Sequence, residues 1–122
     1  MYRSEKNLSE RVSESNRILA RYPNYIPVIV ETSEKEIAKN LLKNKYLVPQ
    51  DVSVSHLMIN IRKNLKVDSK KAVFIFCNNM LVNGTEIMSV LYERYRESLK
   101  KDDPNLSDKF MYITVSYENT FG

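Results

Sequence analysis

The order in which two kinds of apolar run follow one another constrains the fold of this chain more than any other feature. Runs whose apolar residues lie three and four positions apart predict amphipathic helices, and short β-branched runs predict strands. In chain order the sequence predicts helix 8–21, strand 26–30, strand 46–48, helix 54–65, strand 72–77, strand 80–82, helix 85–98 and strand 110–117. This mixture predicts an α+β domain in which helices pack on a sheet.

Each helix is predicted from one apolar stripe. The stripes consist of Leu8, Val12, Ser15 and Leu19 with Ile18 beside them, of Val54, Leu57, Met58, Ile61 and Leu65, and of Ile87, Val90, Leu91 and Tyr95. Pro23 ends the first helix, because proline disfavours a helical residue before it. Asp51 or Ser53 is the expected cap of the second helix, and Thr85 is that of the third.

The strands are bounded by prolines and turn residues. Pro27 is expected near the start of its strand or on a sheet edge, where the missing N–H costs little. The continuous apolar run 72–77 predicts a strand that is covered on both faces and followed by a turn at Asn78 and Asn79. The polar segment 32–45 connects the first two strands and has room for a helical turn.

This order of elements suits a ubiquitin-like β-grasp, a four-stranded mixed sheet with helices, preceded by a helical extension. A chain of 122 residues is long enough for one such core and has no room for a second domain. We expect residues 1–25 to form the extension packed on the core, residues 26–117 to form the β-grasp domain, and residues 118–122 to form a flexible tail.

Residues that carry catalytic or cofactor chemistry are scarce. The chain has two glycines, one histidine and one cysteine, which excludes a glycine-rich phosphate loop and an internal disulfide. We expect His56 to have an ordinary surface or boundary position, and Cys77, at the end of an apolar strand, to be buried and unreactive. The sequence therefore predicts no enzyme activity, no metal site and no cofactor.

The excess of basic residues leaves nucleic acid open as a further class of partner. Nineteen Lys and Arg exceed fifteen Asp and Glu, giving a net charge of +4, and basic residues gather at Arg62, Lys63, Lys66, Lys70 and Lys71. They form either a solvated surface or a nucleic-acid contact, although no aromatic stacking motif accompanies them. No apolar run reaches the roughly 18 residues of a membrane span, and the N-terminus lacks a signal-peptide core, so we expect synthesis in the cytosol.

Five segments, taken in order, resemble one known family. They are 21–31 (RYPNYIPVIVE), 45–51 (KYLVPQD), 61–63 (IRK), 74–79 (FIFCNN) and the tail 112–122. Over nearly its whole length the chain resembles the autophagy-related protein 8 family, the ubiquitin-like modifiers of autophagy.

The resemblance implies a conjugation reaction at the C-terminal glycine. Activating and conjugating enzymes would join Gly122 to the headgroup amine of phosphatidylethanolamine, and a processing and deconjugating cysteine protease would recognise Phe121. Either the precursor already ends at Gly122, or residues after it are removed. The protein would be cytoplasmic when free and would lie on an autophagosomal or other intracellular membrane when lipidated.

The resemblance also implies a groove for adaptor or receptor peptides with an aromatic-x-x-aliphatic motif. The aromatic pocket would consist of Glu14, Ile18, Pro27, Ile29, Lys45, Leu47 and Phe110. The aliphatic pocket would consist of Tyr46, Val48, Pro49, Val52, Leu57 and Ile61. Arg62 would contact acidic residues that flank the motif. Without the resemblance, strand or core packing explains the apolar positions more simply.

Three features depart from the family pattern and bear on ligand preference. The charged loop at approximately 98–109 is longer than usual, Asn60 replaces an apolar residue, and Tyr25 stands where a basic residue is common. The alternative function is a peptide- or cytoskeleton-binding module that is never conjugated. The third possibility is the nucleic-acid binder, which the sequence does not favour.

Overall fold

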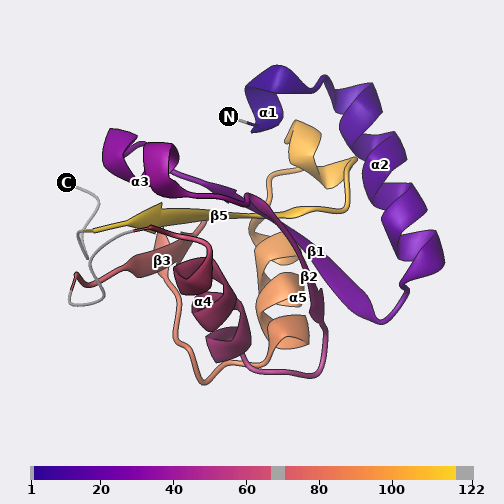
Figure 1. The fold of residues 1–122 in the computed structure, drawn as a ribbon. Coiled ribbons are helices and arrows are strands. Elements are labelled where there is room, and N and C mark those ends of the chain that lie inside the picture. The colour runs from indigo at the N-terminus through magenta and orange to yellow at the C-terminus, as the bar shows by residue number, and fades with distance from the viewer. Residues whose placement is uncertain (1, 67–70, 118–122) are drawn as a thin grey trace.

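The computed structural model describes residues 2–66 and 71–117, in which five strands form one mixed sheet (Figure 1). The strands are β1 (Tyr25–Glu31), β2 (Lys45–Pro49), β3 (Phe74–Cys77), β4 (Met80–Leu81) and β5 (Met111–Ser116). Their spatial order is β2-β1-β5-β3-β4; β1 and β5 are parallel, and the other pairs are antiparallel. The predicted α+β β-grasp class is confirmed, with five strands rather than four because β4 pairs with β3.

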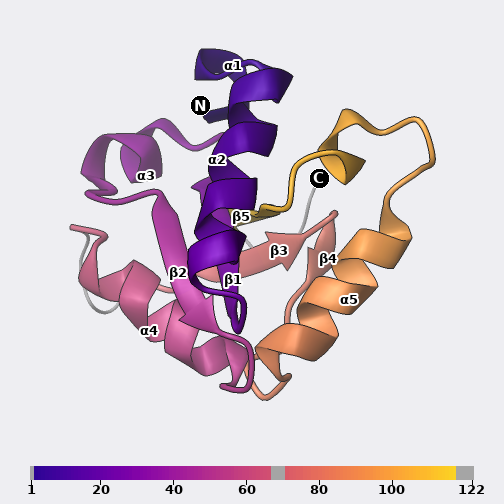
Figure 2. The same ribbon diagram turned by 90° about the vertical axis from the view of Figure 1, so that its right-hand side faces the viewer.

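Helices cover both faces of this sheet. They are α1 (Tyr2–Glu5), α2 (Leu8–Arg21), α3 (Lys35–Asn40), α4 (Val54–Lys63) and α5 (Met88–Ser98), and a 3-10 turn, η1 (Pro104–Leu106), precedes β5. Figures 1 and 2 show α1 and α2 on one face of the sheet, and α4 and α5 on the other. The first two predicted helices are confirmed by α2 and α4.

The main core lies between the sheet and helices α4 and α5. Its most completely buried side chains include Val28, Leu57, Ile61, Met88, Met111 and Val115. Ile75, Phe76 and Cys77 are buried at consecutive positions of β3, as expected of a strand covered on both faces. The connector between β1 and β2 contains α3, whose Ile37 is fully buried.

The strand registers decide which side chains face α2. Pro27 lies opposite Leu47 and Ile29 lies opposite Lys45, so these four side chains point to one face of the sheet. Pro27 is tolerated there because β5 pairs with β1 only from Val28 onward, and its missing N–H interrupts no bond to β5.

The turn between β3 and β4 is confirmed at Asn78 and Asn79. Both residues have positive φ angles, 51° and 66°, and Cys77 pairs with Met80 across the two-residue loop. Two left-handed residues match the right-handed twist of a tight hairpin, and asparagine tolerates this conformation better than most side chains.

The start of α5 differs from the prediction. The helix begins at Met88 with Ile87 as its N-cap, so Thr85 is not the cap. Ile87 is held outside the helix by an isolated bridge to Ser53, the residue that precedes α4. The N–H and hydroxyl of Thr85 instead donate to Oδ1 of Asn83, at 3.0 and 2.9 Å, in a local turn.

This later start also changes the stripe that α5 buries. Leu91 and Tyr95 face the core as predicted, but Ile87 and Val90 are 40% and 53% exposed. Met88, which the predicted stripe omits, is fully buried in their place. The buried stripe of α5 therefore consists of Met88, Leu91 and Tyr95, which are spaced three and four positions apart.

Candidate functional site: a free sheet edge beside α2

Strand β2 lies at one end of the sheet, so one of its edges is not paired within the sheet. On the paired side, the N–H of Val30 donates to the carbonyl of Asn44 at 2.8 Å. Because bonded pairs alternate along an antiparallel ladder, the backbone groups of Lys45 and Leu47 point outward. An extended peptide can add to such an edge as a further strand.

The residues predicted for the aromatic pocket come from four segments on the α2 face. They are Glu14 and Ile18 on α2, Pro27 and Ile29 on β1, Lys45 and Leu47 on β2, and Phe110 before β5. Leu47 is 38% exposed, whereas Ile29 and Phe110 are 0% and 1% exposed. Ile29 and Phe110, the innermost residues of this set, are therefore covered by other parts of the protein and are not exposed to solvent.

Glu14 and Lys45 connect α2 to the edge strand. The ammonium of Lys45 donates to the two carboxylate oxygens of Glu14 at 2.5 and 3.2 Å, and the hydroxyl of Tyr2 donates to this carboxylate at 2.9 Å. Burial favours a raised pKa for Glu14, but the hydrogen bonds from Lys45 and Tyr2 outweigh it and lower the pKa. The carboxylate of Glu14 therefore stays ionised down to a lower pH than that of an ordinary glutamate.

Among the residues predicted for the aliphatic pocket, Tyr46 and Val48 point to the opposite face of β2, and most of the set belongs to the core. Pro49, in contrast, alternates onto the same face as Leu47. Tyr46 and Val48 are buried with Leu57 and Ile61 of α4, both 0% exposed. Pro49 and Val52 are half-buried and form the accessible part of this set. Any ligand side chain would meet Pro49 and Val52 before it reached the α4 residues.

The remaining predicted site residues belong to α4 or lie outside the described residues. Arg62 is half-buried near the end of α4, where its Nη1 donates to the carbonyl of Lys71 at 3.0 Å. Asn60 is exposed on the same helix. Gly122 and Phe121 both lie outside the described residues.

A buried ion pair that the sequence pattern did not reveal holds α2 against the sheet. Nη1 of Arg11 lies 3.0 Å from Oδ2 of Asp108, and their side chains are 9% and 0% exposed. The hydroxyl of Tyr112 donates to the same oxygen at 2.7 Å, and the N–H of Phe110 donates to Oδ1 at 3.0 Å. The available signal was that Arg11 shares a helical stripe with Ser15.

This hydrogen-bond network places the carboxylate of Asp108 beneath α2 and orients Phe110, which forms the floor of the predicted aromatic pocket. Burial raises the pKa of Asp108, although the hydrogen bonds from Tyr112 and Phe110 and the charge of Arg11 oppose the shift. Because Asp108 binds the backbone of Phe110, the carboxylate that anchors α2 also positions the innermost aromatic residue of the pocket.

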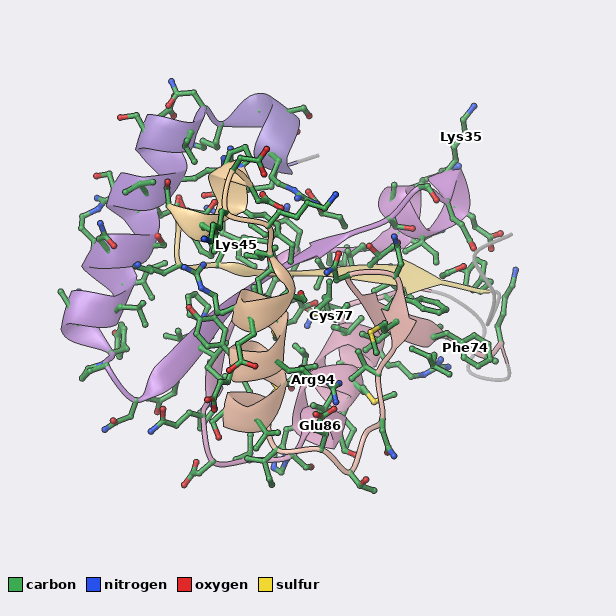
Figure 3. All side chains as sticks on the ribbon, turned by 180° about the vertical axis from the view of Figure 1, so that it is seen from behind. Lys35, Lys45, Phe74, Cys77, Glu86 and Arg94 are labelled. Atoms are coloured by element: carbon green, nitrogen blue, oxygen red, sulfur yellow. The ribbon has the colours of Figure 1, made fainter. Side chains whose placement is uncertain are left out.

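The residues considered for catalysis have ordinary surroundings. His56 is exposed on α4, and Cys77 is buried between β3 and α5 (Figure 3). Burial raises the pKa of Cys77 to about 12. Within residues 2–66 and 71–117, no group of three or more His, Cys, Asp or Glu side chains could hold a metal ion. Among the helices described, none has the length and apolar character needed to cross a membrane.

Part of the basic cluster considered for nucleic-acid binding is engaged within the protein. Nζ of Lys71 lies 3.4 Å from a carboxylate oxygen of Glu36 and 4.0 Å from the ring centre of Tyr117. Lys70 lies outside the described residues. Exposed ion pairs of this kind are typical of an ordinary charged surface.

Comparison with known proteins identifies the family. Residues 10–122 match the family model described as "Autophagy protein Atg8 ubiquitin like". The chain is 43% identical over 122 residues to Autophagy-related protein 8e of Arabidopsis thaliana, covering 100% of this chain and 93% of that protein. It is 39% identical over 121 residues to Autophagy-related protein 8 of Saccharomyces cerevisiae, covering 99% and 96%.

Two solved structures share the fold. The structure "Plasmodium falciparum Atg8 in complex with Plasmodium falciparum Atg3 peptide" has a TM-score of 0.77 at 24% identity and covers 99% of this chain and 98% of that one. Trypanosoma brucei ATG8 has a TM-score of 0.72 at 25% identity, covering 99% and 97%. The chain, which matches the family model over most of its length, belongs to the Atg8 family of ubiquitin-like autophagy proteins.

Proposed function

We propose that this protein is a ubiquitin-like modifier that is conjugated through Gly122 to phosphatidylethanolamine and recruits adaptors to autophagosomal or related membranes. Family membership supports the proposal, because the matched region extends to residue 122. Activating and conjugating enzymes would carry the acyl group as thioesters, and a cysteine protease that recognises Phe121 would process or release it. The chain would be the substrate of these enzymes and would have no catalytic role itself.

Conjugation to a lipid would change the compartment in which the domain acts. The two acyl chains of phosphatidylethanolamine supply the apolar burial that stable membrane attachment requires. The free protein would remain in the cytoplasm, and the lipidated protein would present its β2 edge at the membrane. We accordingly propose that residues 1–25, 26–117 and 118–122 act as extension, recognition domain and conjugation tail.

The free edge of β2 is the observation that carries the recognition part of the proposal. Side chains of an extended chain alternate between faces, so two residues three positions apart point to opposite faces of a sheet. An aromatic residue beside Leu47 on the α2 side would therefore place the aliphatic residue toward Val52 on the α4 side. This geometry fits the aromatic-x-x-aliphatic spacing, with the peptide parallel to β2.

Lipidation tests the conjugation. Incubation with cognate activating and conjugating enzymes, ATP and phosphatidylethanolamine vesicles should yield a lipid adduct, which is expected to be absent when Gly122→Ala is used. An adduct that Gly122→Ala leaves unchanged would contradict the assignment. In cells, the protein should enter the membrane fraction when autophagy is induced. A protein that never does so would instead be an unconjugated peptide- or cytoskeleton-binding module.

Calorimetric titration tests peptide binding to the groove independently of lipidation. An acidic synthetic peptide containing Trp-Ala-Ala-Leu should bind the wild type, and Leu47→Asp should weaken binding about tenfold or more by placing a charge in an apolar contact. Leu81→Asp is the matched control, because Leu81 is 55% exposed on β4, at the opposite end of the sheet from β2. Equal effects of both substitutions would contradict the placement of the groove. Gly122→Ala should leave peptide binding intact.

A further inference from the structure

The side chain of Tyr2 lies among the residues of the aromatic pocket. Its ring is 5.5 Å from the ring of Phe110 in an edge-on contact, and its hydroxyl donates to Glu14 at 2.9 Å. The ammonium of Lys45 lies 4.9 Å from the centre of the same ring. Tyr2 is 3% exposed, so this aromatic side chain is almost entirely removed from water.

The floor of the pocket is covered in this arrangement. Ile29 and Phe110 are 0% and 1% exposed, and a ligand ring can contact them only if some covering group moves. Tyr2 supplies an aromatic ring against Phe110 together with contacts to Glu14 and Lys45. Phe110, Glu14 and Lys45 are also among the residues expected to receive the aromatic residue of an adaptor.

We propose that Tyr2 is an internal ligand of the aromatic pocket, which the aromatic residue of an adaptor peptide must displace. The inference rests on the proposed peptide groove and adds that helix α1 competes with adaptors for it. Because both rings use the same apolar floor and the same Glu14–Lys45 pair, only one of them can be bound at a time.

Helix α1 is suited to such an exchange. It has four residues, and Arg3, the neighbour of Tyr2, attaches it to the sheet. Nε of Arg3 donates to Glu31 at 3.1 Å within an ion pair, and the guanidinium lies 4.2 Å from the ring centre of Tyr112. These Arg3 contacts lie outside the predicted pocket, so Arg3 can hold Tyr2 in place without touching a ligand.

Peptide titrations on the wild type and four variants of the full chain distinguish a displaceable Tyr2 from a fixed pocket wall. The acidic Trp-Ala-Ala-Leu peptide should bind Tyr2→Ala about tenfold more tightly than wild type, because no buried ring has to leave. Tyr2→Phe keeps the ring and should give a smaller gain. Arg3→Ala should also increase affinity by loosening α1. Arg94→Ala is the matched control and should have no effect, because it removes an ion pair between an exposed arginine of α5 and Glu86, on the other face of the sheet (Figure 1).

Fluorine NMR on protein labelled with fluorotyrosine gives a second measurement that does not depend on whether Tyr2→Ala folds. The Tyr2 signal, assigned by its loss in Tyr2→Phe, should shift to the solvent-exposed position when the peptide saturates the protein. A Tyr2 signal that stays in its buried position, or a peptide affinity that Tyr2→Ala and Arg3→Ala leave unchanged or reduce, would overturn the displacement. Failure of the wild type and of all four variants to bind the peptide would overturn the proposed groove and this inference together.

Discussion

Nη1 of Arg11 lies 3.0 Å from Oδ2 of Asp108, although the two residues are 97 positions apart in the chain. This pair attaches the first turn of α2 to the segment that enters β5. The same carboxylate binds the backbone N–H of Phe110, which forms the floor of the candidate aromatic pocket. One buried group therefore fixes both the helix above the pocket and the ring at its base.

Loss of one partner of this pair is expected to destabilise the protein strongly. Arg11→Ala leaves the buried carboxylate of Asp108 without its ion partner and should lower the free energy of unfolding by about 3–5 kcal/mol. Urea denaturation measures the change. Lys6→Ala removes a member of an exposed pair and should cost less than about 1 kcal/mol. A similar small loss for Arg11→Ala would show that the buried pair is not important for stability.

The positive φ angle of Asn79 predicts that two substitutions at this position differ in their effect on stability. Asn79→Gly should be tolerated, because glycine adopts the φ of 66° without strain. Asn79→Val should cost about 1–2 kcal/mol, because its branched side chain crowds the following carbonyl in this conformation. Thermal unfolding of the two variants compares them at the same position. Equal stability of both would contradict the turn geometry.

The lowered pKa of Glu14 predicts how its contacts depend on pH. A carboxyl group with a folded-state pKa below the ordinary 4.5 stabilises the protein above that pH, and this contribution is lost as pH falls through the folded-state pKa. Glu14→Gln should therefore reduce stability by at most about 1 kcal/mol at neutral pH, because Lys45 is exposed. The difference from wild type, measured by urea denaturation at several pH values, should narrow below pH 4.5. A difference that stays constant with pH would exclude this ionic contribution.

The burial of Cys77 predicts a thiol that does not react in the folded state. Its pKa of about 12 leaves very little thiolate at pH 8, and the side chain is 6% exposed. A disulfide-exchange reagent should therefore modify the native protein slowly and the urea-unfolded protein rapidly. Fast reaction of the native protein would show that the thiol is accessible.

The sequence predicted elements well where the spacing of apolar residues or a pair of turn residues is itself a local signal. Apolar spacing identified α2 and α4, and the paired asparagines identified the hairpin after β3. The same reasoning placed the start of α5 too early, because Ile87 is held extended by its bridge to Ser53. That bridge depends on a residue distant in the chain, and local spacing carries no information about it.

The candidate site, too, could be predicted from the sequence only in part. The resemblance supplied a set of pocket residues, and the strand registers place Pro27, Ile29, Lys45 and Leu47 on one face of the sheet. Whether a residue of this set is accessible depends on what packs over it. Leu57, for example, is fully buried beneath the sheet, whereas Leu47 remains 38% exposed on the edge strand.

By itself the sequence determined the fold class, the membership of a family and the residue types available to a peptide groove. These follow from apolar periodicity, turn residues and motifs that are local in the chain. The tertiary structure alone decided that Arg11 pairs with Asp108 and that Tyr2 packs against Phe110. Each of these contacts joins segments that are far apart in the chain, and the local pattern of neither segment reveals its partner, so only the packed fold could bring them together.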